Sequence, residues 1–232
     1  MKKIITFSIS VLILCGIIAG VYLYSRPWTQ GLILSPLYKL AANKKIVALT
    51  FDDGPSKERT PRLLMLLNKH KVQATFFMTG YNIERYPDIA KRVFHEGHLI
   101  GNHSFHHKRM IFKSPVYVAH VIDDADALIR SLGQTNVRFF RPPYSKKLII
   151  LPFLLKMRGK ILVTGTYDPP SEYLSPYNST NIAMDVISNS NPGTIIYLHD
   201  GSDKNVDAFI DSIERIILGL KAKGFAFVRL DE

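Results

Sequence analysis

The sequence is short of the residues that most quickly narrow a protein's class. It contains a single cysteine, Cys15, so no internal disulfide can form and cysteine usage says nothing about the redox compartment. Acidic residues are also few, 19 against 30 lysines and arginines, which leaves a formal net charge of +11. No low-complexity tract or internal repeat occurs, which argues against a disordered chain or a repeat protein. We therefore expect an ordinary globular domain with surplus positive charge.

That surplus does not follow a nucleic-acid-binding pattern. The basic residues are scattered, and their densest groups are Lys44-Lys45, Lys146-Lys147 and Lys156 to Lys160. None of these groups is interleaved with aromatic residues that would stack on bases, so we expect no nucleic-acid partner. An acidic membrane surface or an acidic polymer explains the charge at least as well.

One long apolar run, Ile4 to Tyr24, lies near the N-terminus behind two lysines. About 20 apolar residues can span a bilayer, whereas a cleaved signal peptide has a core of roughly 7–15 residues and a small-residue cleavage site. No good site follows here. We therefore predict a transmembrane signal anchor at residues 1–25, a juxtamembrane linker at 26–43 and a catalytic domain at 44–232. Cleavage would instead give a secreted protein, and the flanking charges nearly balance, so they leave the orientation open.

From residue 44 onward, short strand-like segments alternate with helix-like ones. Thr60-Pro61 and Ser114-Pro115 each offer an N-cap followed by proline at the first helical position. The alternation predicts an α/β fold of parallel strands joined by helical crossovers, either a distorted or incomplete (β/α)7-8 barrel or a doubly wound sheet. The expected strands are Lys45–Phe51, Ala74–Thr79, His98–Gly101, Val137–Phe140, Ile161–Thr166, Thr194–Leu198 and Phe225–Leu230, with further helices at 181–190 and 206–223.

Side chains suited to catalysis follow the C-terminal ends of five of these strands. In a parallel barrel all such ends open on one face, where active sites are built. The five groups are Asp52-Asp53, His103 to His107, Arg141 to Tyr144, Asp168 with Glu172, and His199-Asp200.

The adjacent carboxylates of Asp52 and Asp53 need an explanation, because they repel each other and are costly to desolvate. Neighbouring strand residues point to opposite faces, so both serve one site only if the strand ends there, as Gly54-Pro55 predicts. A cation would offset the repulsion. His103 and His107, at i and i+4, would lie on one face of a helical turn and complete a three-ligand metal site with positions open to water. In the alternative interpretation an aspartate caps a turn and the histidines are surface residues.

Four motifs, TFDDGP (50–55), GNHSFHH (101–107), RPPY (141–144) and YLHDG (197–201), resemble in order and spacing those of the polysaccharide deacetylases with a NodB homology domain, carbohydrate esterase family 4. The resemblance covers about residues 45–230. It implies a distorted (β/α) barrel that removes acetyl groups from N-acetylated sugars with a divalent metal, usually zinc. Its metal ligands would be Asp53, His103 and His107.

The same resemblance implies roles for four further groups. Asp52 would be the general base, held in place by Arg141. The backbone N–H of Tyr144 would contribute to the oxyanion hole, and His199 would be the general acid. These roles suit amide hydrolysis, in which a metal polarises the carbonyl, a base takes the proton of water, donors stabilise the oxyanion and an acid protonates the leaving amine.

The fourth motif departs from the family pattern of an aspartate, two residues and then Asp-Trp. This chain has DPPSEY at 168–173. We expect Glu172 to replace the aspartate that supports the catalytic histidine, with Asp168 as the alternative, and Tyr173 to replace the tryptophan of the acetyl pocket. Tyr197 also stands where a leucine is usual.

The leading interpretation is a membrane-anchored, metal-dependent N-deacetylase of a cell-envelope or exported polysaccharide, acting outside the cytoplasm. Peptidoglycan is the first substrate expected, followed by chitin-like oligomers. Two alternatives stay open, a deacylase or deformylase of a lipid-linked sugar and a catalytically silent glycan-binding relative. The sequence carries no signal for the oligomeric state.

Overall fold

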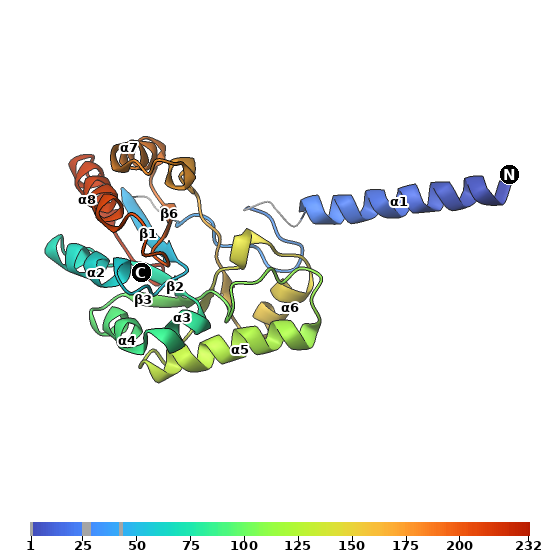
Figure 1. Ribbon diagram of the computed structural model, residues 1–232, viewed down its shortest axis with the longest axis horizontal. Helices are drawn as coiled ribbons and strands as arrows, with labels where there is room; N and C mark the ends of the chain where they lie inside the picture. Colours follow the sequence, from blue (N-terminus) through green and yellow to red (C-terminus); the bar gives the residue numbers. More distant parts are fainter. Residues whose placement is uncertain (1, 25–28, 42–43) are drawn as a thin grey trace.

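The computed structural model describes residues 2–24, 29–41 and 44–232, and its centre is one parallel sheet that curls into an incomplete barrel (Figure 1). The strand order is β5-β4-β3-β2-β1-β6, and β7 pairs with β1. The predicted incomplete barrel is therefore confirmed. The strands are β1 (Ile46–Asp52), β2 (Thr75–Met78), β3 (Leu99–Asn102), β4 (Phe139–Phe140), β5 (Ile161–Leu162), β6 (Thr194–His199) and β7 (Ala226–Phe227).

Helices join these strands and cover the outside of the sheet (Figure 1). Apolar residues of α2, α7 and α8 pack with β1 and β6 in the largest core. The helices are α1 (Lys2–Tyr24), α2 (Arg59–Lys69), α3 (Gly80–Arg85), α4 (Pro87–His95), α5 (Pro115–Ser131), α6 (Ile150–Met157), α7 (Ser179–Asn189) and α8 (Val206–Ala222), with 3-10 turns η1 (Pro143–Ser145) and η2 (Pro170–Tyr173).

The alternation of side chains along β1 decides what lies inside the barrel. Leu49 and Phe51 point outward and join the helix-facing core. Ala48 lies in a separate interior cluster, and the next interior residues, Thr50 and Asp52, both contact one arginine side chain. The strand thus carries apolar residues on its outer face and delivers a carboxylate to the interior at its C-terminal end.

The barrel is closed by isolated bridges rather than by a continuous ladder. Tyr167, after β5, forms a parallel bridge with Ile196 of β6. Leu37 forms another with Val163, and its N–H donates to the carbonyl of Leu162 at 2.8 Å. Part of the segment predicted as a linker therefore lies against the barrel, and the predicted domain limits stay a prediction.

Several element ends differ from the predictions because tertiary contacts replace local signals. Ser114 caps α5 as predicted, accepting from the N–H of Tyr117 at 3.2 Å. Thr60 is not an N-cap: α2 starts at Arg59, two residues before the predicted start at Pro61, and the Thr60 hydroxyl instead accepts from the N–H of Ser56 at 2.8 Å. In α7, Asn178 is the cap, so that helix starts two residues before the predicted range.

The N-terminal helix α1 extends away from the barrel over 23 residues (Figure 1). Within the described parts of the chain, no helix combines the length and hydropathy required of a membrane span. The predicted membrane anchor therefore stays a prediction.

Candidate active site and metal centre

A fully buried ion pair between Asp52 and Arg141 lies at the centre of the site. Asp52 ends β1, and its Oδ1 accepts from Arg141 Nη1 at 2.6 Å. The same Nη1 donates to the hydroxyl of Thr50 at 2.8 Å, and Nη2 donates to the carbonyl of Thr164 at 3.1 Å. These bonds fix the Asp52 carboxylate, because a buried charge is stable only when it is paired and hydrogen-bonded.

Two aromatic rings enclose the arginine. The guanidinium carbon of Arg141 lies 4.0 Å from the ring centre of Phe77 and 4.1 Å from that of Tyr197. Tyr197, noted above as a departure from the family pattern, is therefore a buried stacking partner of Arg141. Cation–π contacts of this kind stabilise a guanidinium that is removed from water.

The chain turns sharply after Asp52, as the adjacent carboxylates required. Asp53 has a φ of 70°, in the left-handed region, so its side chain leaves the strand direction. Gly201 packs against this turn so closely that a Cβ would overlap the Cβ of Asp53, and a Cβ on Gly54 would overlap the carboxylate of Asp200. The turn therefore requires glycine at both positions.

Asp53 and two histidines present three ligand atoms to one point. Asp53 Oδ1 lies 3.4 Å from His103 Nε2 and 3.1 Å from His107 Nε2. All three ligand atoms lie within 4.8 Å of one another. Asp53 Oδ1 is buried without a hydrogen-bond partner in the described residues, which is the expected condition of an oxygen that binds a cation.

The orientation of His103 also fits a metal ligand. Its Nδ1 lies 2.7 Å from the carbonyl oxygen of Arg141, which can only accept a hydrogen bond. Nδ1 therefore carries a proton and leaves Nε2 free in the neutral ring, the arrangement found where a histidine binds a metal. The donor set of one carboxylate and two imidazoles suits a divalent metal such as zinc.

The charges at the site favour a cation. Burial alone would raise the pKa of Asp53, but the closeness and positive charge of His103 hold it well below its usual range. Burial would lower the pKa of His103, but the charges of Asp52 and Asp53 outweigh it and raise that pKa. The carboxylates therefore favour positive charge at this point.

The two histidines do not lie on a helical turn, which corrects the prediction from their spacing. Residues 103–110 form an irregular loop in which Ser104 and His107 both have positive φ, 64° and 53°. The side chain of Asn102 accepts from the backbone N–H of Ser104 at 2.7 Å. The Ser104 hydroxyl in turn accepts from the backbone N–H of His107 at 3.2 Å. These side-chain bonds hold a conformation that the i, i+4 spacing alone does not reveal.

Across the site, Glu172 holds His199 by two hydrogen bonds. Glu172 Oε2 lies 2.9 Å from His199 Nδ1, and Oε1 accepts from the His199 N–H at 3.0 Å. Burial would lower the pKa of His199, but the hydrogen bond and charge of Glu172 outweigh it and raise the pKa to about 9. The imidazole is therefore held in its protonated, proton-donating form at neutral pH.

Asp168 occupies a different position. Its carboxylate accepts from the hydroxyl of Tyr173 at 2.9 Å, and burial raises its pKa to about 6. The same hydroxyl lies 3.4 Å from the His199 ring. Between the two candidates left open by the sequence, the structure puts Glu172 against His199 and Asp168 one side chain further away. Asp168, Glu172 and His199 form a second group of potential metal ligands.

Tyr144 lies at the edge of the site on η1. Its φ of 58° turns the chain, and its half-exposed ring lies 4.8 Å from that of His107. The guanidinium of Arg109 lies 5.0 Å from the same ring. The role of the Tyr144 N–H in an oxyanion hole stays a prediction.

Thr60 and Asp200 are two buried contributors whose roles sequence reasoning missed. The Thr60 hydroxyl donates to Asp200 Oδ2 at 2.5 Å, and the Asp200 N–H donates to the carbonyl of Asp52 at 3.1 Å. Asp200 thus supports the turn after β1. The sequence places Asp200 in a motif at the end of a strand, but no local signal pairs it with Thr60, 140 positions away.

Comparison with known proteins agrees with this geometry. The family profile described as polysaccharide deacetylase matches residues 39–150. A peptidoglycan-N-acetylglucosamine deacetylase from Bacillus cereus is 36% identical over 191 residues, which cover 81% of this chain and 68% of that protein. The chain belongs to the polysaccharide deacetylase family. A chitooligosaccharide deacetylase from Azorhizobium caulinodans is 29% identical over 205 residues, and the match covers 84% of this chain and 97% of that protein.

Solved structures of this polysaccharide deacetylase family share the fold. A peptidoglycan N-acetylglucosamine deacetylase superposes with a TM-score of 0.78 at 33% identity, covering 83% of this chain and 89% of that one. A pseudoenzyme of carbohydrate esterase family 4 from Bacillus anthracis superposes with a TM-score of 0.77 at 25% identity, covering 86% and 69%. The shared fold alone therefore does not separate active from inactive members.

The two groups of potential ligands can be told apart by metal content. We expect Asp53→Ala to lose most bound divalent metal, because it removes one of three candidate ligands, whereas Asp52→Asn keeps about one ion per chain. Asp168→Ala is the matched control, which removes a carboxylate from the second group. The measurement is elemental analysis of each purified variant. Metal retained by Asp53→Ala but lost from Asp168→Ala would place the ion beside His199 instead.

Replacing the partner of His199 should change the pH dependence of activity. A raised pKa keeps His199 protonated until the pH approaches that value, so activity that needs the proton is lost only above it. Glu172→Gln removes the charge, so we expect the pKa to fall and the basic limb of kcat/KM to move to lower pH. Zinc content should not change. A shift produced by Asp168→Asn and absent from Glu172→Gln would assign the supporting role to Asp168.

Proposed function

We propose that the protein is a metal-dependent N-deacetylase of an N-acetylated glycan, with peptidoglycan as the first candidate substrate and chitin-like oligomers as the second. The observation that carries this proposal is the division of the Asp52-Asp53 pair. One carboxylate is clamped by a buried arginine, and the other shares a point with two imidazoles. Relatives named as peptidoglycan and chitooligosaccharide deacetylases support both substrate classes.

Asp53, His103 and His107 would hold the divalent metal. When bound, the metal would supply Lewis acidity, which polarises a carbonyl and makes water more acidic. Asp52 is suited to accept the proton of the attacking water, because its Oδ2 is buried without a hydrogen-bond partner in the described residues, while Oδ1 is occupied by Arg141. The ion pair keeps this carboxylate in one orientation through the reaction.

His199 is suited to protonate the departing amine. Glu172 accepts a hydrogen bond from Nδ1, and its charge favours the protonated ring, in which Nε2 also carries a proton available for transfer. The hydroxyl of Tyr173 beside the ring extends the polar wall on this side. Amide cleavage needs such an acid, because an unprotonated amine is a poor leaving group.

The reaction can be tested with one conservative variant. Asp52→Asn keeps the volume of the side chain but cannot take a proton, so we expect turnover to fall roughly 10²–10⁴-fold. Peptidoglycan fragments and chitin oligomers are incubated with each protein, and acetyl loss is read by mass spectrometry. Asp168→Asn serves as the matched carboxylate-to-amide control. Zinc-loaded wild type that removes no acetyl group, from these or from lipid-linked amino sugars, would identify a silent binding relative.

We also propose that α1 anchors the protein with the barrel outside the cytoplasm. The apolar composition of residues 4–24 and the cell-wall substrates of the relatives support this orientation. Protease added to intact spheroplasts should therefore digest the barrel while a cytoplasmic marker stays whole. Protection of the barrel until lysis would reverse the orientation.

A further inference from the structure

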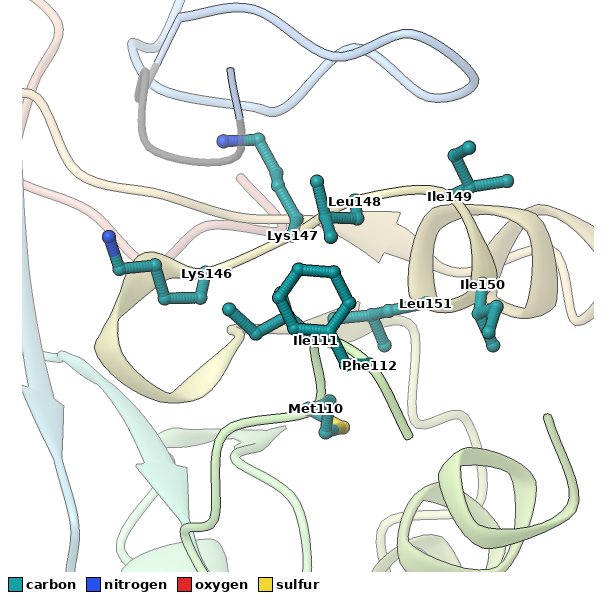
Figure 2. A pocket seen from close by; sticks show the side chains of 9 residues that line it. All are labelled: Met110, Ile111, Phe112, Lys146, Lys147, Leu148, Ile149, Ile150 and Leu151. Atoms are coloured by element: carbon teal, nitrogen blue, oxygen red, sulfur yellow. The ribbon is translucent and has the colours of Figure 1, made fainter. Parts of the chain in front are cut away.

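An apolar cavity of about 310 Å³ lies beside the two loops that supply the catalytic groups (Figure 2). Met110 to Phe112, which follow His107, form one wall, and Lys146 to Leu151, which follow Tyr144, form the other. Figure 2 shows the apolar side chains around the ring of Phe112, with both lysine nitrogens pointing away from it. A sugar needs hydrogen-bond partners for its hydroxyls, so this lining suits hydrocarbon better.

Exposed apolar side chains continue this lining onto the surface. Phe112 is 69% exposed, and Ile149, Phe153 and Met157 are 56%, 52% and 70% exposed. The last three are four residues apart and therefore share the outer face at α6. The inner face of α6 packs in a core with α5. The fold does not require the outer apolar face, and gathered exposed apolar groups of this size indicate a contact surface.

Positive charge predominates around this surface. Residues 97–122 and 127–167 contain no aspartate or glutamate, and Asp123 of α5, which lies between these segments, is paired with Arg158 at 2.7 Å. The exposed Lys108, Arg109, Lys113 and Lys156 belong to these segments. A partner that matches the surface must therefore offer hydrocarbon and negative charge together.

The surface lies on the same side of the molecule as the N-terminal helix. Lys146, at the cavity wall, has its ammonium 5.0 Å from the ring centre of Tyr22 in α1. In Figure 1, α6 and the start of α5 lie on the side of the barrel from which α1 extends. The apolar side chains of α1, such as Leu12 and Ile13, are themselves exposed.

We propose that Phe112, Ile149, Phe153 and Met157, with the surrounding lysines and Arg109, dock on a lipid bilayer that contains anionic lipids. Aromatic and aliphatic side chains among basic residues are the composition that binds at such an interface. A second copy of this surface would bring like charges together, and a soluble acidic polymer would leave the apolar groups exposed to water. Docking would hold the Tyr144 edge of the site at the membrane surface, whatever reaction the site performs.

Site-specific fluorescence on the full chain tests this contact. In a Cys15→Ser background, Phe112→Cys and Phe153→Cys carry an environment-sensitive fluorophore. Met65→Cys on α2 and Met184→Cys on α7 are matched controls, since both methionines are exposed, at 68% and 58%. The proteins are added to vesicles of phosphatidylcholine and phosphatidylglycerol in which some acyl chains carry a nitroxide quencher. The unmodified chain labelled at Cys15 reports on α1 separately.

We expect the probes at 112 and 153 to shift to shorter wavelength and to be quenched several-fold, with the probes at 65 and 184 unchanged from buffer. In vesicles without phosphatidylglycerol, the quenching should weaken several-fold, as should quenching of the 112 probe after Lys113→Glu. Unquenched probes at 112 and 153 overturn the proposal, whether or not the Cys15 probe inserts. A wavelength shift that grows with protein concentration without vesicles also overturns it, because a second copy then covers the surface.

Discussion

The buried ion pair between Arg141 and Asp52 is the constraint on which the rest of the site depends. Removing two charges from water costs several kcal/mol for each ion, so the pair needs further contacts to be stable. The barrel interior supplies hydrogen bonds to Nη1 and Nη2 of Arg141 through Thr50 and the Thr164 carbonyl, and two aromatic rings enclose the guanidinium. The Arg141 carbonyl then fixes the tautomer of His103. One residue thus orients both the carboxylate that we propose as the base and the imidazole that we propose as a metal ligand.

The adjacency of Asp52 and Asp53 follows from this arrangement. Asp52 belongs to the strand and faces the barrel interior, where an arginine neutralises it. Asp53 belongs to the turn, where a positive φ and the tight packing of Gly201 direct it to the histidines. Two adjacent carboxylates therefore experience different surroundings, and that difference suits the two roles that we propose, a cation ligand and a proton acceptor.

The sequence predicts the fold and the grouping of polar residues at strand ends correctly. It does not predict the contacts that individual side chains make. The parallel sheet and the gathering of polar groups at strand ends follow from periodicity and from residue types at those ends. Thr60 carried a good local capping signal, but its hydroxyl pairs with Asp200 across the barrel. The spacing of His103 and His107 matched a helix, yet side-chain bonds from Asn102 and Ser104 hold an irregular loop. No local signal contains the Thr60–Asp200 pair, which spans 140 positions, whereas the loop bonds span only two and three residues and compete with a helix.

The division between core and site explains why membership of the family is separable from activity. The outer residues of β1, Leu49 and Phe51, pack with helices in a core that does not include the side chains of the site. A pseudoenzyme with a TM-score of 0.77 to this chain fits that view. Beyond that core, three features converge: a clamped Asp52, a three-ligand group and a Glu172–His199 pair. The case for catalysis therefore depends on these side chains, because a relative named as a pseudoenzyme shares the fold.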